Sequence, residues 1–174
     1  MFHSAVRKLA VLAAAAPLAL VAPAPAHAGS PVPAIIAARL MAQLPVPARQ
    51  LMSQLVTKTN QQRWAAGCGL LGVDQELIIA SVQQSEHMAL TGDFNHVWLN
   101  GSTFVSRSRS AGYLQPTGEN LAFGYTTADQ VIAAWMASPD HRANMLDCTA
   151  RSIGTGVTFS ADGTPYYTQL FGRI

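Results

Sequence analysis

The chain has 174 residues, with 11 lysines or arginines, 9 aspartates or glutamates and a formal net charge of +2. Only 11% of the residues are charged and no long basic stripe is present, which argues against a nucleic-acid-binding protein. A single domain of this size can bury enough apolar surface to fold without a structural metal or dense crosslinking.

The first 28 residues have the order of a secretory signal peptide. Arg7 and Lys8 precede an apolar run at 9–21, and the small-residue motif Ala26-His27-Ala28 follows it. The run is too short to span a bilayer, and no later run approaches the roughly 20 residues that a transmembrane helix needs. We therefore expect cleavage after Ala28 and a secreted, extracellular protein without a transmembrane span.

Residues 29–48 form a proline-rich segment that we interpret as a linker or pro-segment. Within it, Ile36, Leu40 and Leu44 recur at helical spacing, which predicts one amphipathic helix. The main domain is expected to span residues 49–174.

Local signals predict three helices in the first part of this domain. Apolar residues recur at a helical period from residue 49 until Gly67 ends the helix. Asp74 is a suitable N-cap for a second helix, which stops near Gly92. A third, shorter helix is expected within residues 102–112.

Two more helix starts follow, and then a β-hairpin. Thr127 and Gln130 match a capping box, and Ser138 followed by Pro139 opens a short new helix. Residues 151–159 and 165–172 are rich in β-branched and aromatic residues and flank an Asp-Gly turn. With "GENLAFGY" (118–125) as another strand, the pattern predicts a sheet covered on both faces by helices.

Two cysteines, Cys68 and Cys148, remain after the expected cleavage. An oxidising destination favours a disulfide between them, which closes a long loop and could stabilise the fold by about 4 kcal/mol. The alternative is a pair of unpaired buried thiols.

The candidate chemistry lies in three histidines and one acid: His87, His96, His141 and Glu119. His96, His141 and Glu119 together would suit a divalent cation such as Zn²⁺ with an open coordination position, although their spacing is a weak signal. Alternatively, Glu119 bonds loop amides and His141 caps or packs. A Ser-His-Glu hydrolase using Ser138 or Ser85 is a further alternative, without a G-x-S-x-G motif to support it.

Five motifs in order resemble the CAP superfamily of cysteine-rich secretory, antigen 5 and pathogenesis-related proteins, and most closely its short bacterial secreted branch with a single SCP domain. The motifs are "TNQQR", "FNH", "GENLAFG", "AWMASPDHRANML" and "YYTQLFG", and the similarity runs from about Leu51 to the C-terminus. The resemblance implies a three-layer α/β/α sandwich with a central antiparallel sheet.

The resemblance also implies a cleft in which Glu119, His96 and His141 face one another. Family members from animals and plants carry a second Glu where this chain has Ser138, so a bound cation would be less neutralised here. Bacterial members often carry a histidine at the position of Gln84, one helical turn before His87. Asn120 and Asn144 are interpreted as amides that tie loop backbones together around the cleft.

We therefore expect a secreted, monomeric binding module whose cleft takes a divalent cation, a small lipid-like ligand or a cell-envelope component. The alternative is a metal-dependent or Glu-His hydrolase, a peptidase or esterase, with Glu119 as general base. A scaffold that binds an extracellular partner through residues 95–102 is a third possibility. Trp135, Tyr167 and Phe171 are expected in the core, and Tyr166 is expected to face outward.

Overall fold

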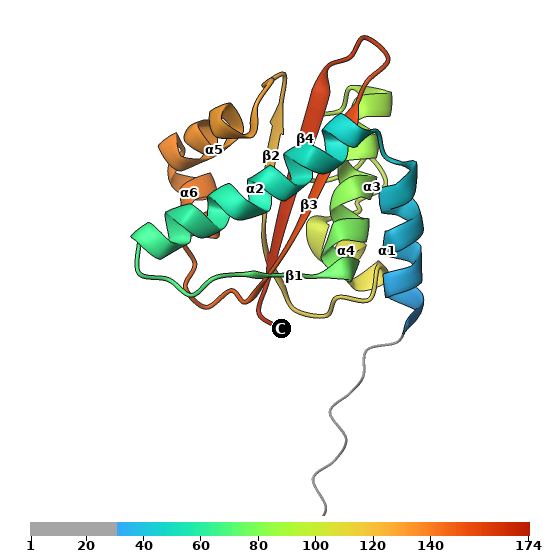
Figure 1. Cartoon of the computed structure of the whole chain (residues 1–174). Helices are drawn as coiled ribbons and strands as arrows, with labels where there is room; N and C mark the ends of the chain where they lie inside the picture. The colour runs from blue at the N-terminus through green and yellow to red at the C-terminus, as the bar shows by residue number, and fades with distance from the viewer. Residues whose placement is uncertain (1–30) are drawn as a thin grey trace, which may run out of the picture.

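The computed structural model describes residues 31–174 (Figure 1), so the expected signal peptide lies outside the described residues. The helices are α1 (Pro31–Gln43), α2 (Val46–Ala65), α3 (Gln75–Thr91), α4 (Phe104–Ser110), α5 (Ala128–Ala137) and α6 (Pro139–Met145). The strands are β1 (Gly72–Val73), β2 (Pro116–Phe123), β3 (Ser152–Phe159) and β4 (Pro165–Gly172). Among residues 31–174, no helix combines the length and apolar composition that crossing a bilayer requires.

The capping signals place the helix ends where the sequence predicted them. Asp74 accepts a hydrogen bond from the Leu77 amide at 2.9 Å, and Gly92 ends α3 in the left-handed region at φ 71°. Thr127 and Gln130 form both halves of the capping box that starts α5. Ser138 is the N-cap of α6, although its side chain makes no capping hydrogen bond.

The four strands are ordered β1-β3-β4-β2 in one sheet. The predicted hairpin is confirmed, because β3 and β4 pair antiparallel, and β2 pairs antiparallel with β4. The sheet is nevertheless mixed rather than wholly antiparallel, since Gly72 and Val73 pair parallel with Ser152 and Ile153. A strand of only two residues has no alternating pattern, so no local signal in the sequence indicated it.

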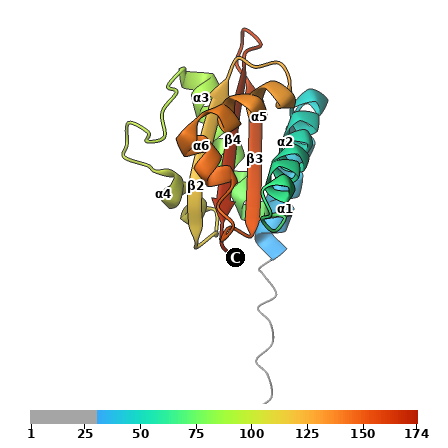
Figure 2. The ribbon, with the colours of Figure 1, turned by 90° about the vertical axis from the view of Figure 1, so that its left-hand side faces the viewer.

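Helices cover both faces of the sheet, which confirms the three-layer α/β/α arrangement (Figure 2). On one face, Thr155 of β3 donates a hydrogen bond to the Met52 carbonyl of α2. On the other face, α3 lies so close to β3 that a Cβ added to Gly154 or Gly156 would come within 2.3 Å of the α3 backbone. Alternate residues of one strand therefore contact different layers.

The proline-rich segment contains helix α1, as the apolar spacing predicted. Ala37 is fully buried, and Leu40, Met41 and Leu44 pack against the main core. Whether this segment is processed in the mature protein stays a prediction, but its apolar side chains belong to the folded structure.

The core is as expected at its aromatic positions, since Trp135, Tyr167 and Phe171 are at most 1% exposed. Tyr166 is half-buried, on the opposite face of β4 from Tyr167. Cys68 and Cys148 form the predicted disulfide. Beside it, the buried guanidinium of Arg63 donates hydrogen bonds to the carbonyls of Gly69, Met145, Asp147 and Ala150, which fixes the disulfide-bearing loops.

The close approach of α3 and β3 makes Gly156 intolerant of a side chain. We expect Gly156→Ala to lower the free energy of unfolding by about 3 kcal/mol, because the new methyl group would overlap the Ser81 backbone. Urea denaturation measures this change. Gly69→Ala is the matched control, because a Cβ there has nothing within 4 Å. Equal stability of the two variants would contradict the packing described here.

Candidate functional site

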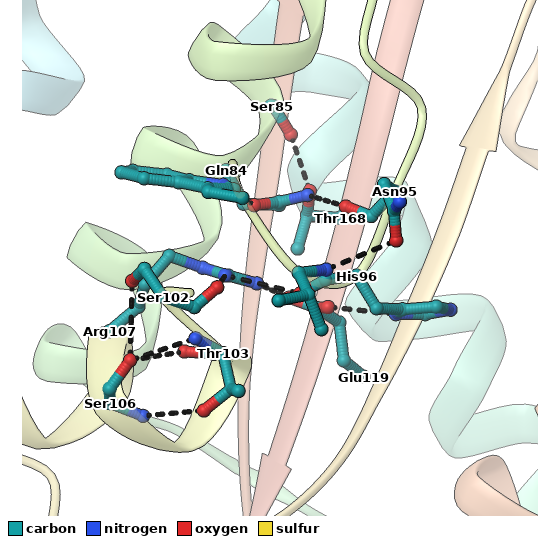
Figure 3. A network of polar contacts seen from close by, with 12 residues as sticks. Gln84, Ser85, Asn95, His96, Ser102, Thr103, Ser106, Arg107, Glu119 and Thr168 are labelled. Atoms are coloured by element: carbon teal, nitrogen blue, oxygen red, sulfur yellow. Dashed lines mark hydrogen bonds and ion pairs between the residues drawn. The ribbon is translucent and has the colours of Figure 1, made fainter. Parts of the chain in front are cut away.

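Glu119 lies in β2, and its side chain is only 1% exposed. One carboxylate oxygen, Oε2, accepts a hydrogen bond from Arg107 Nη2 at 2.7 Å. The other, Oε1, lies 2.9 Å from Nδ1 of His96 (Figure 3). The acid of the "GENLAFGY" motif is thus buried, and each of its oxygens has a partner.

Arg107, on α4, is the partner that compensates the buried negative charge, and it was not among the predicted site residues. Its side chain is 2% exposed, and Nη1 also donates to the carbonyls of His96 and Ser102. A buried carboxylate needs such a partner, because an unpaired buried charge is very costly. Because few residues of the chain are charged, a basic partner for Glu119 could have been expected from the composition. The sequence did not show that this partner is Arg107.

The contact with Glu119 determines how His96 presents its ring. A carboxylate accepts hydrogen bonds, so Nδ1 carries the proton and Nε2 is left as the free acceptor. The His96 side chain is 51% exposed. Glu119 therefore holds the His96 ring at Nδ1, while about half of the side chain is exposed to solvent.

Trp98 holds the loop that carries His96 against the rest of the fold. Its Nε1 donates to Gln84 Oε1 at 2.5 Å, and Gln84 Nε2 donates to the Asn95 carbonyl. The ring of His87 stacks on Trp98 with centroids 4.3 Å apart, and Arg107 lies over Trp98 at 5.2 Å. Gln84 and His87 thus support the loop.

His141 reaches the site from the first turn of α6. Its carbonyl accepts a hydrogen bond from Asn120 Nδ2, while Asn144 Nδ2 donates to the Glu119 carbonyl and to Asn120 Oδ1. These amides join α6 to β2. Burial, and secondarily the nearby His96, lower the pKa of the His141 imidazole.

A groove of about 420 Å³ lies along the free edge of β2, beside His141. Its apolar lining comes from the loop after α3, from β2 and from α5: Phe94, Leu121, Ala122, Phe123, Tyr125, Ala134 and Trp135. Ser138 and His141 supply its polar end.

A metal centre needs more ligands than this arrangement offers. Within residues 31–174, no group of three or more His, Cys, Asp or Glu side chains is placed to hold a metal ion. Both oxygens of Glu119 are bonded to Arg107 and His96, so its carboxylate is not free to bind a metal ion. The side chains in this arrangement do not fit a metal centre. Direct binding of a metal ion by Glu119 stays a prediction.

The sequence model of the Cysteine-rich secretory protein family, CAP, matches residues 56–171. The chain belongs to the CAP family. The uncharacterized protein YkwD of Bacillus subtilis (strain 168) is 31% identical over 121 residues, which cover 69% of this chain and 46% of YkwD. The uncharacterized membrane protein YlbC of the same organism is 29% identical over 119 residues, covering 68% of this chain and 33% of YlbC. The chain thus spans less than half the length of these curated CAP relatives.

Solved structures share the CAP fold. An extracellular protein containing a SCP domain from Bacillus anthracis str. Ames is 26% identical, with a TM-score of 0.66 over 73% of this chain and 41% of that one. An outer surface protein from Borrelia burgdorferi is 21% identical, also with a TM-score of 0.66, over 72% of this chain and 93% of that one. The bacterial CAP branch indicated by the sequence motifs is confirmed.

The ion pair of this CAP domain can be tested by removing its partners singly and together. We expect Arg107→Met to lower the free energy of unfolding by about 3–5 kcal/mol, because it leaves a buried carboxylate unpaired. The double variant Arg107→Met/Glu119→Gln should lose less than the sum of the single variants. Urea denaturation gives both values, and Arg109→Met, at an exposed position of the same helix, is the control. Additive losses would show that the two groups are not coupled.

The lowered pKa of His141 predicts a pH dependence of stability. Below the ordinary histidine value of 6.5, the unfolded chain takes up a proton that the folded His141 does not, so the free energy of unfolding falls. Asp74 acts in the opposite sense, because burial raises its pKa to about 6 in the folded state. Comparing wild type with His141→Gln at pH 7.5 and 5.5 isolates the histidine. The variant should lose less stability on acidification, and an unchanged difference would refute the assignment.

Proposed function

We propose that this CAP domain is an extracellular binding module that takes a small amphiphilic ligand in the groove along β2. The observation that carries the proposal is the groove itself, which has an apolar wall and a polar end formed by Ser138 and His141. A hydrocarbon portion would lie against Phe94 and Phe123, where burial of apolar surface favours binding. A polar head would meet Ser138 and His141.

Charge favours a neutral or anionic head group. Arg107 and Glu119 form an ion pair in which the two formal charges cancel. His96 offers a hydrogen-bond acceptor at Nε2, and either imidazole becomes a cation when protonated. Glu119 is not available to a cationic head group, because both of its oxygens are already bonded, whereas a hydroxyl or carboxylate head group would find hydrogen-bond partners in Ser138 and His141.

The free edge of β2 is poorly suited to pairing with an added peptide strand. The Glu119 carbonyl accepts a hydrogen bond from Asn144, and the Leu121 carbonyl accepts one from the indole of Trp135. Both edge acceptors are already occupied by side chains, which blocks β-strand addition at these positions. This supports a small ligand held by side chains.

The cation and the hydrolase remain predictions with less support. Two imidazoles are a partial ligand set for Zn²⁺ while Glu119 is bonded to Arg107 and His96. Within residues 31–174, no hydroxyl or thiol hydrogen bonds to the ring of His96 or His141, so no nucleophile is paired with a base. Glu119, buried and bonded twice, is poorly placed as a general base for water.

Two proteins of similar structure support an extracellular location. One is described as an extracellular protein and the other as an outer surface protein. Together with the signal-like N-terminus, they support secretion of this chain to a place where it meets envelope components.

A pair of adjacent alanines tests the groove. Ala134 lines the groove, whereas the neighbouring Ala133 is exposed and does not. We expect wild type to bind the fluorescent fatty acid cis-parinaric acid, and Ala134→Phe to weaken binding at least about tenfold by filling the cavity. Ala133→Phe should bind like wild type. Failure of wild type to bind, or equal affinities for the two variants, would overturn the proposal.

A further inference from the structure

The layer formed by α1 and α2 carries only one sign of charge. Between residues 29 and 73 the sequence contains Arg39, Arg49, Lys58 and Arg63 and no aspartate or glutamate. Arg63 is buried against backbone carbonyls, and Lys58 pairs with Asp129 at 2.5 Å. Neither Arg39 nor Arg49 forms an ion pair with a described residue. Their charges are therefore uncompensated locally.

Apolar side chains project from the same layer. Trp64, near the end of α2, is 77% exposed, and Leu70 and Val73 in the following segment are 59% and 53% exposed. Trp64 and Leu70 border a groove of about 430 Å³ along α2, with Val56, Thr57, Asn60 and Gln61. A second groove of about 230 Å³ shares Val56 and Thr57 and reaches Met41, Val73 and Arg49. The apolar surface is thus continuous and ends at a basic side chain.

We propose that this surface docks on the face of an anionic lipid bilayer. Trp64 and Leu70 would enter the interfacial region, and Arg49 would lie among anionic head groups. An indole has an apolar body and a polar N–H, and tryptophan is enriched at membrane interfaces for that reason. Basic side chains beside interfacial apolar ones add electrostatic attraction to anionic lipid.

Charge favours a bilayer over a second copy of this chain. A symmetric contact through α2 would bring two acid-free basic surfaces together, which is unfavourable. An anionic lipid surface instead supplies the opposite sign of charge across a broad plane. With one arginine at the groove and few apolar anchors, the docking is weak and reversible.

The proposed docking surface and the His96 loop lie on opposite sides of the sheet. In Figure 2, α1 and α2 lie on one side of the sheet, whereas α4 and the loop that carries His96 lie on the other. Glu119 and His96 are on this second side. Docking through α2 would hold the protein at the membrane with its His96 loop turned away from the lipid.

Vesicle co-sedimentation tests the proposal. The purified protein, with its N-terminus defined by mass spectrometry, is mixed with phosphatidylcholine vesicles with or without 30% phosphatidylglycerol. We expect the anionic vesicles to bind it at least about tenfold more tightly, and 0.5 M salt to weaken that binding. Trp64→Ser/Leu70→Ser should lose most of the binding. Leu99→Ser, which removes a leucine that is 99% exposed elsewhere, should not.

Three outcomes would overturn the proposal. The first is no binding of wild type to anionic vesicles, and the second is undiminished binding of Trp64→Ser/Leu70→Ser. The third is a concentration-dependent dimer, seen by sedimentation velocity without lipid and lost in Trp64→Ser, which would assign the surface to a second copy. Brominated lipids add a direct readout, because they should quench tryptophan fluorescence in wild type and much less in Trp64→Ser. Circular dichroism shows whether the variants fold.

Discussion

The buried ion pair between Arg107 and Glu119 is the constraint on which the site depends. It attaches α4 to β2, and through two further hydrogen bonds from the same guanidinium it fixes the backbone of the loop that carries His96. A buried ion pair contributes little net stability, because desolvation offsets the Coulomb attraction. Its effect here is to fix positions, because neither residue can move without leaving the other as an unpaired charge. The ring of His96, which is bonded to Glu119, is therefore held in one orientation.

Local and long-range information explain which features the sequence could predict. Asp74, Gly92 and Thr127 act within one helical turn, so their residue types alone placed the ends of α3 and α5. The order of the family motifs predicted that His96, Glu119 and His141 lie in one region of the fold. The stacking of His87 on Trp98 and the pairing of Arg107 with Glu119 join side chains of different elements and loops, and no local pattern encodes such contacts. β1 was missed because two residues cannot show a period.

The charges around the cleft favour the proposed amphiphile over a cation. Family members with a second carboxylate can balance a dication, but here Ser138 occupies that position and Arg107 engages the carboxylate that remains. A Zn²⁺ ion held by two neutral imidazoles would keep both positive charges, and it would lie in the same site as the guanidinium of Arg107. An uncharged or anionic ligand meets no such opposition. The apolar wall beside His141 then becomes the main source of binding free energy, so affinity should follow the apolar area that a ligand buries.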